Sequence, residues 1–375
     1  MNVIIVSHSW THGVQHELRN YLNRKETGCT VLINHPLPDA RQPLPSTCEV
    51  YRNGTLSNRW EVHRRHLPEL LSYCQDPFYT LFFLKKVQIH FDLFIGADSI
   101  NALTGLWLKN RGSVERVIYY SHSLRDKRYS FFLSNMIYHY LDTLCIRNSD
   151  YIWNLSRRLT EKRSRQNIPP TKNLWVPVGI NYNEIKRLPT PQVDRYHLVF
   201  SGHLRKTNGL ELAIKALPAL RKKIPPIKLT IIGSGEIESG LRNMVKESGL
   251  EDCVQFIGLM DYHHLLEFLP HCGIGIAPYT PDPDSIIWST DPTKIKDYLA
   301  CGLPVIVTNV AESSIEIEEE KAGQVISYDQ DEFQRAVEAL TRDEKIYAEY
   351  KQNAIRLASR YDWDIIYDRV MAETS

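Results

Sequence analysis

The sequence lacks several features that would assign it to a special class. It has no apolar run of about 18 residues, the length that a transmembrane helix needs. It has no low-complexity tract and no internal repeat, which argues against disordered and repeat proteins. Its seven cysteines are scattered without CxxC spacing, which argues against a disulfide framework or structural zinc and favours a reducing cytoplasm. The first residues, MNVIIVSHSW, contain only four consecutive apolar residues and no basic region, so we expect a strand rather than a signal peptide.

The composition is that of a globular enzyme, with 43% hydrophobic and 24% charged residues. A chain of 375 residues is too long for most single cores and suits two domains. The net charge of +1 conceals an asymmetry, because residues 1–190 carry +10 and the remainder carries −9. The two halves therefore offer different surfaces to partners.

Basic and aromatic residues occur together in two stretches of the first half, 77–86 and 124–141. Such mixtures suit an anionic membrane surface, where apolar rings enter the interface and Lys and Arg meet lipid phosphates. The alternative is a buried helix with a solvated basic rim. Nucleic acid is not favoured as a partner, because no recognised binding motif accompanies the charge.

Short apolar runs alternate with helix-length patterns, which is typical of α/β proteins with parallel sheets. The strands expected in the first half are residues 3–6, 30–34, 92–95, 116–120, 151–155 and 174–176. Those expected in the second half are residues 197–201, 228–232, 254–257, 273–277, 304–307 and 324–326. The polar stretch 179–196, with two prolines, is the predicted linker. Two Rossmann-like domains follow, over residues 1–182 and 195–359.

The segment DPTKIKDYLACGLPVIVT, residues 291–308, joins a predicted helix to a buried strand through Gly302. Lys294 and Asp297 lie three residues apart and share a helix face near the N-terminus, where backbone N–H groups favour an anion. A lysine there suits a phosphate, and a carboxylate suits sugar hydroxyls. The alternative is an ordinary helix–strand unit with solvated charges.

Three more glycine turns follow predicted strands of the second domain, at Gly202, Gly233–Gly235 and Gly258. The carboxyl ends of parallel strands are where α/β sheets bind nucleotides. A lone GSG turn is weak evidence, because any tight turn between strand and helix uses glycine.

In this order, the segments FSGHLRKTNGLELAIKA, LTIIGSGEIESGLRNMV, VQFIG and KIKDYLACGLPVIVT resemble the donor-binding half of retaining GT-B glycosyltransferases of family 4. The resemblance covers about residues 198–310 and is nearest to bacterial and archaeal polysaccharide transferases. It implies two Rossmann-like domains facing across a cleft and sugar transfer from a nucleotide-sugar with retention, without metal or other cofactor. It also implies that Asp297 holds the ribose, that Gly258, Leu259 and Met260 edge the base, and that residues 360–375 form a helix packing back on the first domain.

The chain departs from the family's GRLxxxKG arrangement, which clamps the diphosphate, because His203 and Asn208 replace its Arg and Lys. Ser289 stands where the family has a glutamate that contacts the donor sugar, and Asp284 and Asp291 are candidate substitutes. The residues that we expect to replace the missing positive charge are Arg205, Lys206 and Lys294. The full predicted donor site is Gly13, Gly202, His203, Arg205, Lys206, Asn208, Gly233, Gly235, Gly258, Leu259, Met260, Asp291, Lys294 and Asp297.

The first domain is expected to bind the acceptor. His122 follows a predicted strand in VIYYSHSLRD and resembles the family's active-site histidine, which contacts the donor sugar. Asp98 follows another strand and is expected to contact the acceptor, so these two residues are the catalytic candidates. Gly13 opens a helix after the first strand, where its backbone could approach a phosphate.

The resemblance predicts a cytoplasmic hexosyltransferase, peripheral on the inner face of a membrane, that acts on a glycan, lipid-linked or polysaccharide acceptor. Two alternatives stay open. One is a GT-B epimerase of sugar nucleotides, which needs more acids and histidines in the cleft than this sequence offers. The other is a non-catalytic nucleotide-sugar-binding protein, which His203, Asn208 and Ser289 make conceivable.

Overall fold

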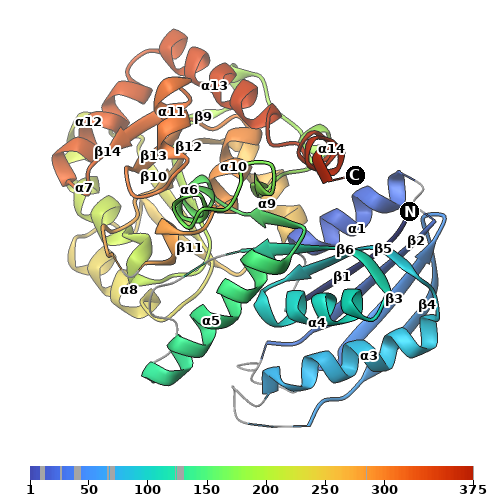
Figure 1. The fold of residues 1–375 in the computed structure, drawn as a ribbon. Helices are drawn as coiled ribbons and strands as arrows, with labels where there is room; N and C mark the ends of the chain where they lie inside the picture. Colours follow the sequence, from blue (N-terminus) through green and yellow to red (C-terminus); the bar gives the residue numbers. More distant parts are fainter. Residues whose placement is uncertain are drawn as a thin grey trace. The chain divides into compact units, whose positions relative to one another are not determined.

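The computed structural model describes residues 1–8, 13–25, 28–37, 44–65, 67, 72–122, 124, 131–283 and 285–374. The chain divides into two compact units (Figure 1). Unit 1 comprises Met1–Pro177 and Ile366–Ser375, and unit 2 comprises Val178–Ile365. Within the described residues, no helix is both long and apolar enough to cross a membrane.

Unit 1 is built on an eight-stranded sheet in the order β4-β3-β2-β1-β5-β6-β7-β8. The strands β1 and β2 and the run from β5 to β8 are parallel, and their apolar residues are buried on both faces, as a helix-covered sheet requires. The strands are β1 (Asn2–His8), β2 (Cys29–His35), β3 (Ser46–Arg52), β4 (Thr55–Val62), β5 (Phe91–Ala97), β6 (Val114–Ser121), β7 (Tyr151–Asn154) and β8 (Asn173–Trp175).

The antiparallel hairpin of β3 and β4 is the part of this sheet that the sequence analysis missed. Its turn is Asn53–Gly54, and both residues have positive φ, 47° and 75°. An Asn-Gly pair between two alternating segments is a strong hairpin signal, because both positions of a type I′ turn need the left-handed region. The signal was therefore present in the sequence YRNGTLSNRW.

The helices of unit 1 are α1 (Val14–Arg24), α3 (Gln75–Val87), α4 (Ser99–Asn110), α5 (Phe132–Asn148), α6 (Arg157–Arg165) and, from Ile366 on, most of α14 (Trp363–Thr374). The helix α4 contacts both α3 and α5, so these three form one neighbouring group (Figure 1). The helix α14 is tied to α1, because the Tyr21 hydroxyl donates to Asp368 at 2.7 Å and the Tyr367 hydroxyl donates to the Val14 carbonyl at 3.0 Å.

Unit 2 contains a six-stranded parallel sheet in the order β11-β10-β9-β12-β13-β14. Its strands are β9 (Asp194–Ser201), β10 (Lys228–Ile232), β11 (Val254–Gly258), β12 (Cys272–Ala277), β13 (Val305–Thr308) and β14 (Gly323–Ile326). Its helices are α7 (Leu210–Lys223), α8 (Glu238–Glu247), α9 (Tyr262–Phe268), α10 (Thr293–Ala300), α11 (Ser314–Glu319), α12 (Gln330–Thr341) and α13 (Glu344–Ser359). Numbered within this unit, the strand order is 3-2-1-4-5-6, that of a dinucleotide-binding Rossmann fold.

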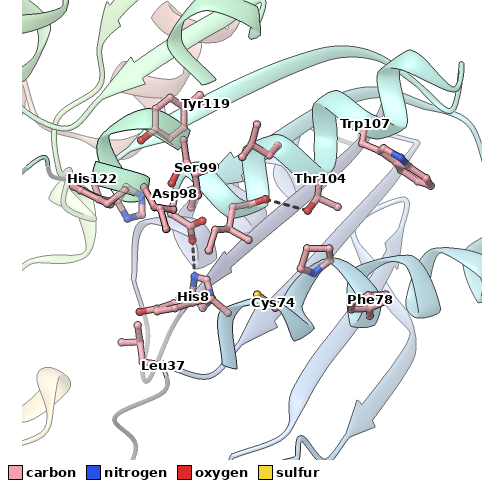
Figure 2. A pocket seen from close by; sticks show the side chains of 18 of the residues that line it. His8, Leu37, Cys74, Phe78, Asp98, Ser99, Thr104, Trp107, Tyr119 and His122 are labelled. Carbon is pink, nitrogen blue, oxygen red and sulfur yellow. Dashed lines mark hydrogen bonds and ion pairs between the residues drawn. The ribbon is translucent and has the colours of Figure 1, made fainter. Parts of the chain in front are cut away.

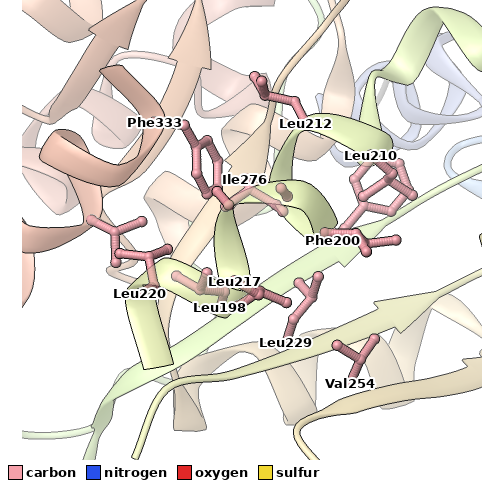
Figure 3. Packing of buried hydrophobic residues seen from close by; sticks show 14 of the residues in the cluster. Leu198, Phe200, Leu210, Leu212, Leu217, Leu220, Leu229, Val254, Ile276 and Phe333 are labelled. Carbon is pink, nitrogen blue, oxygen red and sulfur yellow. The ribbon is translucent and has the colours of Figure 1, made fainter. Parts of the chain in front are cut away.

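A large apolar cluster of unit 2 lies between this sheet and the helices α7, α8 and α12 (Figure 3). The apolar face of α7, with Leu210, Ile214 and Leu217, is fully buried against Leu198 and Phe200 of β9. Burying each such side chain contributes about 1.5–3 kcal/mol. The core thus fixes β9, whose end carries the first glycine turn.

The stretch 179–196 contains two short 3-10 helices, η1 (Tyr182–Glu184) and η2 (Thr190–Gln192), and its last residues begin β9. It belongs to unit 2 throughout.

Candidate functional site

In unit 2, the strand order reverses between β9 and β12. The loops at the carboxyl ends of two such strands diverge, and the crevice between them is the usual ligand site of open α/β sheets. Gly202 follows β9 directly, and Pro278 and Tyr279 follow β12. Gly202, which the sequence analysis assigned to a donor site, therefore lies at this crevice.

The glycine turns of this crevice are packed backbone against backbone. Gly202 and Gly233 have φ values of 133° and 128°, which other residues rarely adopt. A Cβ atom on Gly233 would lie 2.0 Å from the Gly202 carbonyl oxygen, and one on Gly235 would lie 2.3 Å from that of Leu204. The Gly233 N–H donates to the Gly258 carbonyl at 2.7 Å. These turns require glycine, and they hold the three loops together.

Lys294, in the first turn of α10, lies at the crevice between β9 and β12. Its Nζ is 3.9 Å from the ring centroid of Phe200 and 5.7 Å from that of Tyr279. A Cβ atom on Gly202 would lie 2.8 Å from the same Nζ. Among the described residues, no carboxylate lies within ion-pair distance of this ammonium group, and burial lowers its pKa to about 7. A cation in this state gains stability when an anion binds beside it.

Asp297 lies one turn further along α10 and is only 4% exposed. The Tyr262 hydroxyl, at the start of α9, donates a hydrogen bond to its Oδ1 at 2.8 Å. Burial raises the pKa of Asp297 to about 7, although the Tyr262 hydrogen bond and the charge of Lys296 act in the opposite direction. The sequence analysis predicted the shared face of Lys294 and Asp297 but not the partner Tyr262.

Asp291 is engaged within the protein. Its carboxylate forms an ion pair with the buried ammonium group of Lys296 and accepts a hydrogen bond from the Val178 N–H at 2.9 Å. The Nζ of Lys296 also lies 4.1 Å from the ring centroid of Tyr361. Buried pairs of this kind are costly to break, because the remaining charge would be left uncompensated. Asp291 thus anchors the segment before α10; Asp284, the other predicted substitute for Ser289, lies outside the described residues.

Two basic residues that follow β9 are candidates for binding the diphosphate. Arg205 lies just before the short helix η3 (Lys206–Asn208), and Lys206 is its first residue. Arg205 and Lys206 are exposed, and within the described part of the chain neither forms an ion pair. Asn208 is buried, and its side-chain amide donates to the His203 carbonyl at 2.5 Å. The His203 ring in turn lies 2.6 Å, through Nδ1, from the Ser234 carbonyl. His203 and Asn208 therefore shape the loop, while Arg205 and Lys206 present charge.

The third loop, Gly258 to Met260, is exposed at its tip. Gly258 has a φ of 81° with open space beside it, and the Leu259 side chain is 82% exposed. An exposed apolar side chain next to a free backbone edge is able to cover one face of a flat ring.

The corresponding point in unit 1 is the reversal between β1 and β5. His8 ends β1 and Asp98 follows β5, and the two side chains meet, with His8 Nδ1 2.5 Å from an Asp98 oxygen. The other ring nitrogen of His8 lies 2.7 Å from buried Asp76, which is also paired with Arg64 at 2.7 Å. Burial alone would lower the pKa of His8, but Asp98 and Asp76 outweigh it and raise the pKa to about 9. His8 is therefore an imidazolium at neutral pH, and it donates to both carboxylates.

Asp98 has a strained backbone, with a φ of 106° and a ψ of 169°. This region is otherwise used almost only by glycine, and such strain is concentrated at functional sites. The carboxylate accepts a hydrogen bond from the Asn101 N–H at 3.0 Å and so caps α4. The predicted residue Asp98 is thus held in place by its helix and by His8, which the sequence analysis did not single out.

His122 follows β6 and stacks edge-on against Tyr120, with ring centroids 4.6 Å apart. Burial lowers the pKa of His122 to about 4, although the charge of Asp98 acts in the opposite direction. Its Nε2 atom is buried and has no hydrogen-bond partner among the described residues. A buried polar atom without a partner is a place where a ligand group can gain a hydrogen bond.

These residues line one end of a cavity of about 900 Å³ that lies wholly within unit 1. Figure 2 shows His8, Asp98 and His122 at one end of it and Phe78 and Trp107 at the other. Most of the lining is apolar and comes from α3, α4 and α5. Gly13, the remaining predicted residue of this unit, is the N-cap of α1, and its N–H donates to the His16 ring at 3.1 Å.

The described residues contain no group of three or more His, Cys, Asp or Glu side chains arranged to hold a metal ion.

The sequence of the chain is similar to those of known glycosyltransferases. Residues 182–357 match the sequence model of the family described as glycosyl transferases group 1. The amylovoran biosynthesis glycosyltransferase AmsK of Erwinia amylovora is 29% identical over 105 residues, which cover 28% of this chain and 26% of that protein. The D-inositol 3-phosphate glycosyltransferase of Paenarthrobacter aurescens is 25% identical over 200 residues, 52% of this chain and 47% of that protein. The chain thus spans about a quarter to a half of these relatives.

Among solved structures, Anabaena Alr3699/HepE in complex with UDP has a TM-score of 0.73 at 14% identity, covering 100% of this chain and 99% of that one. This likeness confirms the predicted fold class, an α/β protein of the GT-B type with two Rossmann-like sheets.

Proposed function

We propose, from the match of residues 182–357 to the sequence model of glycosyl transferases group 1, that the protein transfers a sugar from a nucleotide-sugar donor to an acceptor, with retention. The observation that carries the proposal is the pair of Lys294 and Asp297 on one face of α10, beside the point where the strand order of unit 2 reverses. One side chain suits a phosphate and the other suits sugar hydroxyls.

In the proposed complex, Asp297 accepts hydrogen bonds from the ribose hydroxyls, and the loop Gly258 to Met260 lies along the base. The diphosphate lies beside Lys294 and the glycine turn at Gly202, with Arg205 and Lys206 at its open side. Binding an anion there favours the protonated form of Lys294 and raises its pKa from about 7. The complexes of Anabaena HepE with UDP and with UDP-glucose support a uridine nucleotide as the first donor to test.

During the proposed transfer, the bond from the anomeric carbon to the diphosphate oxygen breaks, and a bond to the acceptor oxygen forms on the same face of the sugar. The proton of the acceptor hydroxyl passes to the departing phosphate oxygen. Lys294 stabilises the charge that develops on the diphosphate, which is the main contribution a preorganised site makes to such a step. Because Lys294, Arg205 and Lys206 supply the positive charge, we expect transfer without an added metal or other cofactor.

We further propose that unit 1 docks on an anionic membrane from the cytoplasmic side. The exposed apolar face of α5 consists of Phe132, Leu133, Met136, Ile137 and Tyr140. It is continued by exposed Phe78 and Phe82 of α3 and Trp107 of α4, with Lys86 and Arg111 stacked on the last two of these rings. Exposed rings with adjacent cations suit lipid tails and phosphates, respectively.

The test is a panel of UDP-, GDP- and ADP-sugars, with release of nucleoside diphosphate and the anomeric configuration of the product followed by NMR. We expect one donor to give nucleoside diphosphate and a product with the donor's configuration, at an unchanged rate in EDTA. An inverted product would contradict retention. A new epimer of the sugar nucleotide, or no binding of any donor, would overturn the proposed transfer.

A further inference from the structure

We propose that the cavity of unit 1 holds the hydrocarbon chain of a lipid-linked acceptor, whose hydroxyl-bearing head lies at Asp98 and His122. The inference rests on the proposed glycosyl transfer, because it names the class of acceptor for that reaction. It depends on three independent features of the cavity: its lining, its opening and its polar end.

The lining suits a chain without polar groups. Between Phe78 and Trp107 at one end and His8 at the other, the walls are formed by aliphatic side chains of three helices, Leu81 of α3, Leu103 of α4 and Leu141 of α5. At about 900 Å³, the cavity lies within the range of about 300–1,000 Å³ that holds a ligand of drug size. The lining also includes Thr104, Ser134 and Tyr138, but most of it is apolar, so a soluble glycan would leave many of its hydroxyls without partners.

The opening of the cavity coincides with the proposed membrane-docking face. Phe78, Trp107 and Ile137 line the cavity, and the same three residues are among the exposed large apolar side chains. The apolar surface therefore continues from the outside of α3, α4 and α5 into the interior of unit 1. A hydrocarbon chain leaving a bilayer could enter along this path without crossing water.

The polar end offers hydrogen-bonding groups for a head group. The Asp98 carboxylate lines the cavity, and it accepts a hydrogen bond from the His8 ring. The Nε2 atom of His122 is buried without a partner in the described residues, and that imidazole is neutral at pH 7 because its pKa is lowered by burial. Among the described residues, the positive charges of His8 and Arg64 are matched by the carboxylates of Asp76 and Asp98, so these four groups offer no excess positive charge to a phosphate. A sugar hydroxyl, which donates to Asp98 and pairs with His122, fits better.

The chain offers a matched pair of variants on α5. Ile137 and Met136 are neighbours of similar exposure, 47% and 51%, but only Ile137 lines the cavity. Phe78 and Phe82 of α3 form a second pair, in which only Phe78 lines the cavity. Replacing either member of a pair by Asp alters the docking face. Only one of the two replacements also alters the cavity.

The probe is dodecyl maltoside below its critical micelle concentration, with maltose as the chain-free control, titrated into the full chain in a calorimeter. We expect one dodecyl maltoside to bind and maltose to show at least tenfold weaker binding. Ile137→Asp and Phe78→Asp are expected to weaken the binding of dodecyl maltoside at least tenfold, whereas Met136→Asp and Phe82→Asp leave it within twofold of the wild type.

Equal effects within each pair would overturn the proposal, as would maltose binding as well as its dodecyl derivative. Circular dichroism checks that each variant is folded, and the second pair serves if a member of the first is not. Because this titration contains no nucleotide-sugar, a cavity that binds the probe in a protein that binds no donor would contradict the proposed transfer and leave the cavity assignment standing.

Discussion

The point at which the strand order reverses carries different residues in the two units of this protein. In unit 2, the reversal between β9 and β12 is edged by glycine turns and carries Lys294 and Asp297, two groups whose pKa values are both about 7. In unit 1, the reversal between β1 and β5 carries the ion-paired residues His8 and Asp98, beside a cavity formed by three helices.

Under the proposed function, the two reversals of strand order would recognise different ligands. A nucleoside diphosphate is small, charged and of fixed geometry, so backbone turns and a few side chains within one short segment are sufficient. An amphipathic acceptor is recognised by shape and by the order of apolar and polar surface, and helices distant in sequence build that shape.

The largest effect is expected from Asp297→Ala. Two hydrogen bonds from ribose hydroxyls to a carboxylate would be lost, each worth about 1.5–3 kcal/mol. The affinity for the donor should fall about 100-fold or more, as measured by calorimetry. Asp252→Ala, which removes an exposed carboxylate paired with Arg221, is the control and should leave the affinity unchanged. An unaltered affinity in Asp297→Ala would remove this residue from the donor site.

Lys294→Met should lower the rate of transfer about 30-fold, because a charge-assisted hydrogen bond to the departing diphosphate is worth about 2 kcal/mol. Lys294→Arg keeps the charge and should restore a large part of the rate, as followed by release of nucleoside diphosphate under saturating donor. If the methionine variant turned over at the wild-type rate, the diphosphate would have to be held elsewhere.

Donor affinity should be greatest near pH 7 and fall about tenfold for each pH unit well away from it. Burial raises the pKa of Asp297 to about 7, so its carboxylate is lost as the pH falls below that value. Burial lowers the pKa of Lys294 to about 7, so its ammonium group is lost as the pH rises above it. Lys294→Arg should abolish only the alkaline decline; a calorimetric profile that is flat from pH 6 to 9 would contradict both assignments.

Membrane docking should be weakened about tenfold by Phe132→Asp. This side chain is 80% exposed, and burying it in a lipid interface would contribute about 1.5–3 kcal/mol. Flotation with anionic liposomes measures the effect, and wild-type flotation should decline in high salt. Ile346→Asp, an exposed apolar residue of α13 in unit 2, is the matched control. A wild-type protein that never floats would refute the docking proposal.

The smallest effect is expected from Tyr262→Phe, which removes the hydrogen bond to Asp297. That bond lowers the pKa of Asp297, so without it the pKa rises further and less carboxylate is present at pH 7. Donor affinity at pH 7 should fall about threefold, as expected for a hydrogen bond worth about 0.5–1.5 kcal/mol. The ratio of variant to wild-type affinity should return towards one at pH 8, and a ratio independent of pH would show that Tyr262 acts in another way.

The arrangement around Lys294 and Asp297 was easier to predict from the sequence than the cluster at Asp98. Lys294 and Asp297 lie within one helical turn, and the turns at Gly202 and Gly233 follow buried strands directly, so local spacing identified them. The cluster at Asp98 was only partly predictable, because His8 and Asp76 reach it from 90 and 22 positions earlier in the chain. Nothing in the local pattern indicated that Asp76 would be buried.

Two other features depended on contacts that sequence spacing does not reveal. Tyr262 reaches Asp297 across 35 positions, and its place at the start of a helix gave no sign of this partner. Asp291 was predicted to bind the donor, yet its carboxylate forms a buried ion pair with Lys296, five residues later. The pair lies within one segment, but whether such a charge faces solvent or the interior is decided by tertiary packing.

We propose that unit 2 binds the donor and unit 1 binds the acceptor. The most direct test of this division is the UDP affinity of two matched variants, Asp98→Asn and Asp297→Asn. Each replaces one carboxylate by an amide of the same size, and asparagine can still cap α4 and tolerate the positive φ at position 98. We expect calorimetry to find at least tenfold weaker UDP binding for Asp297→Asn and wild-type binding for Asp98→Asn. Equal loss in both variants, or loss in Asp98→Asn alone, would contradict it.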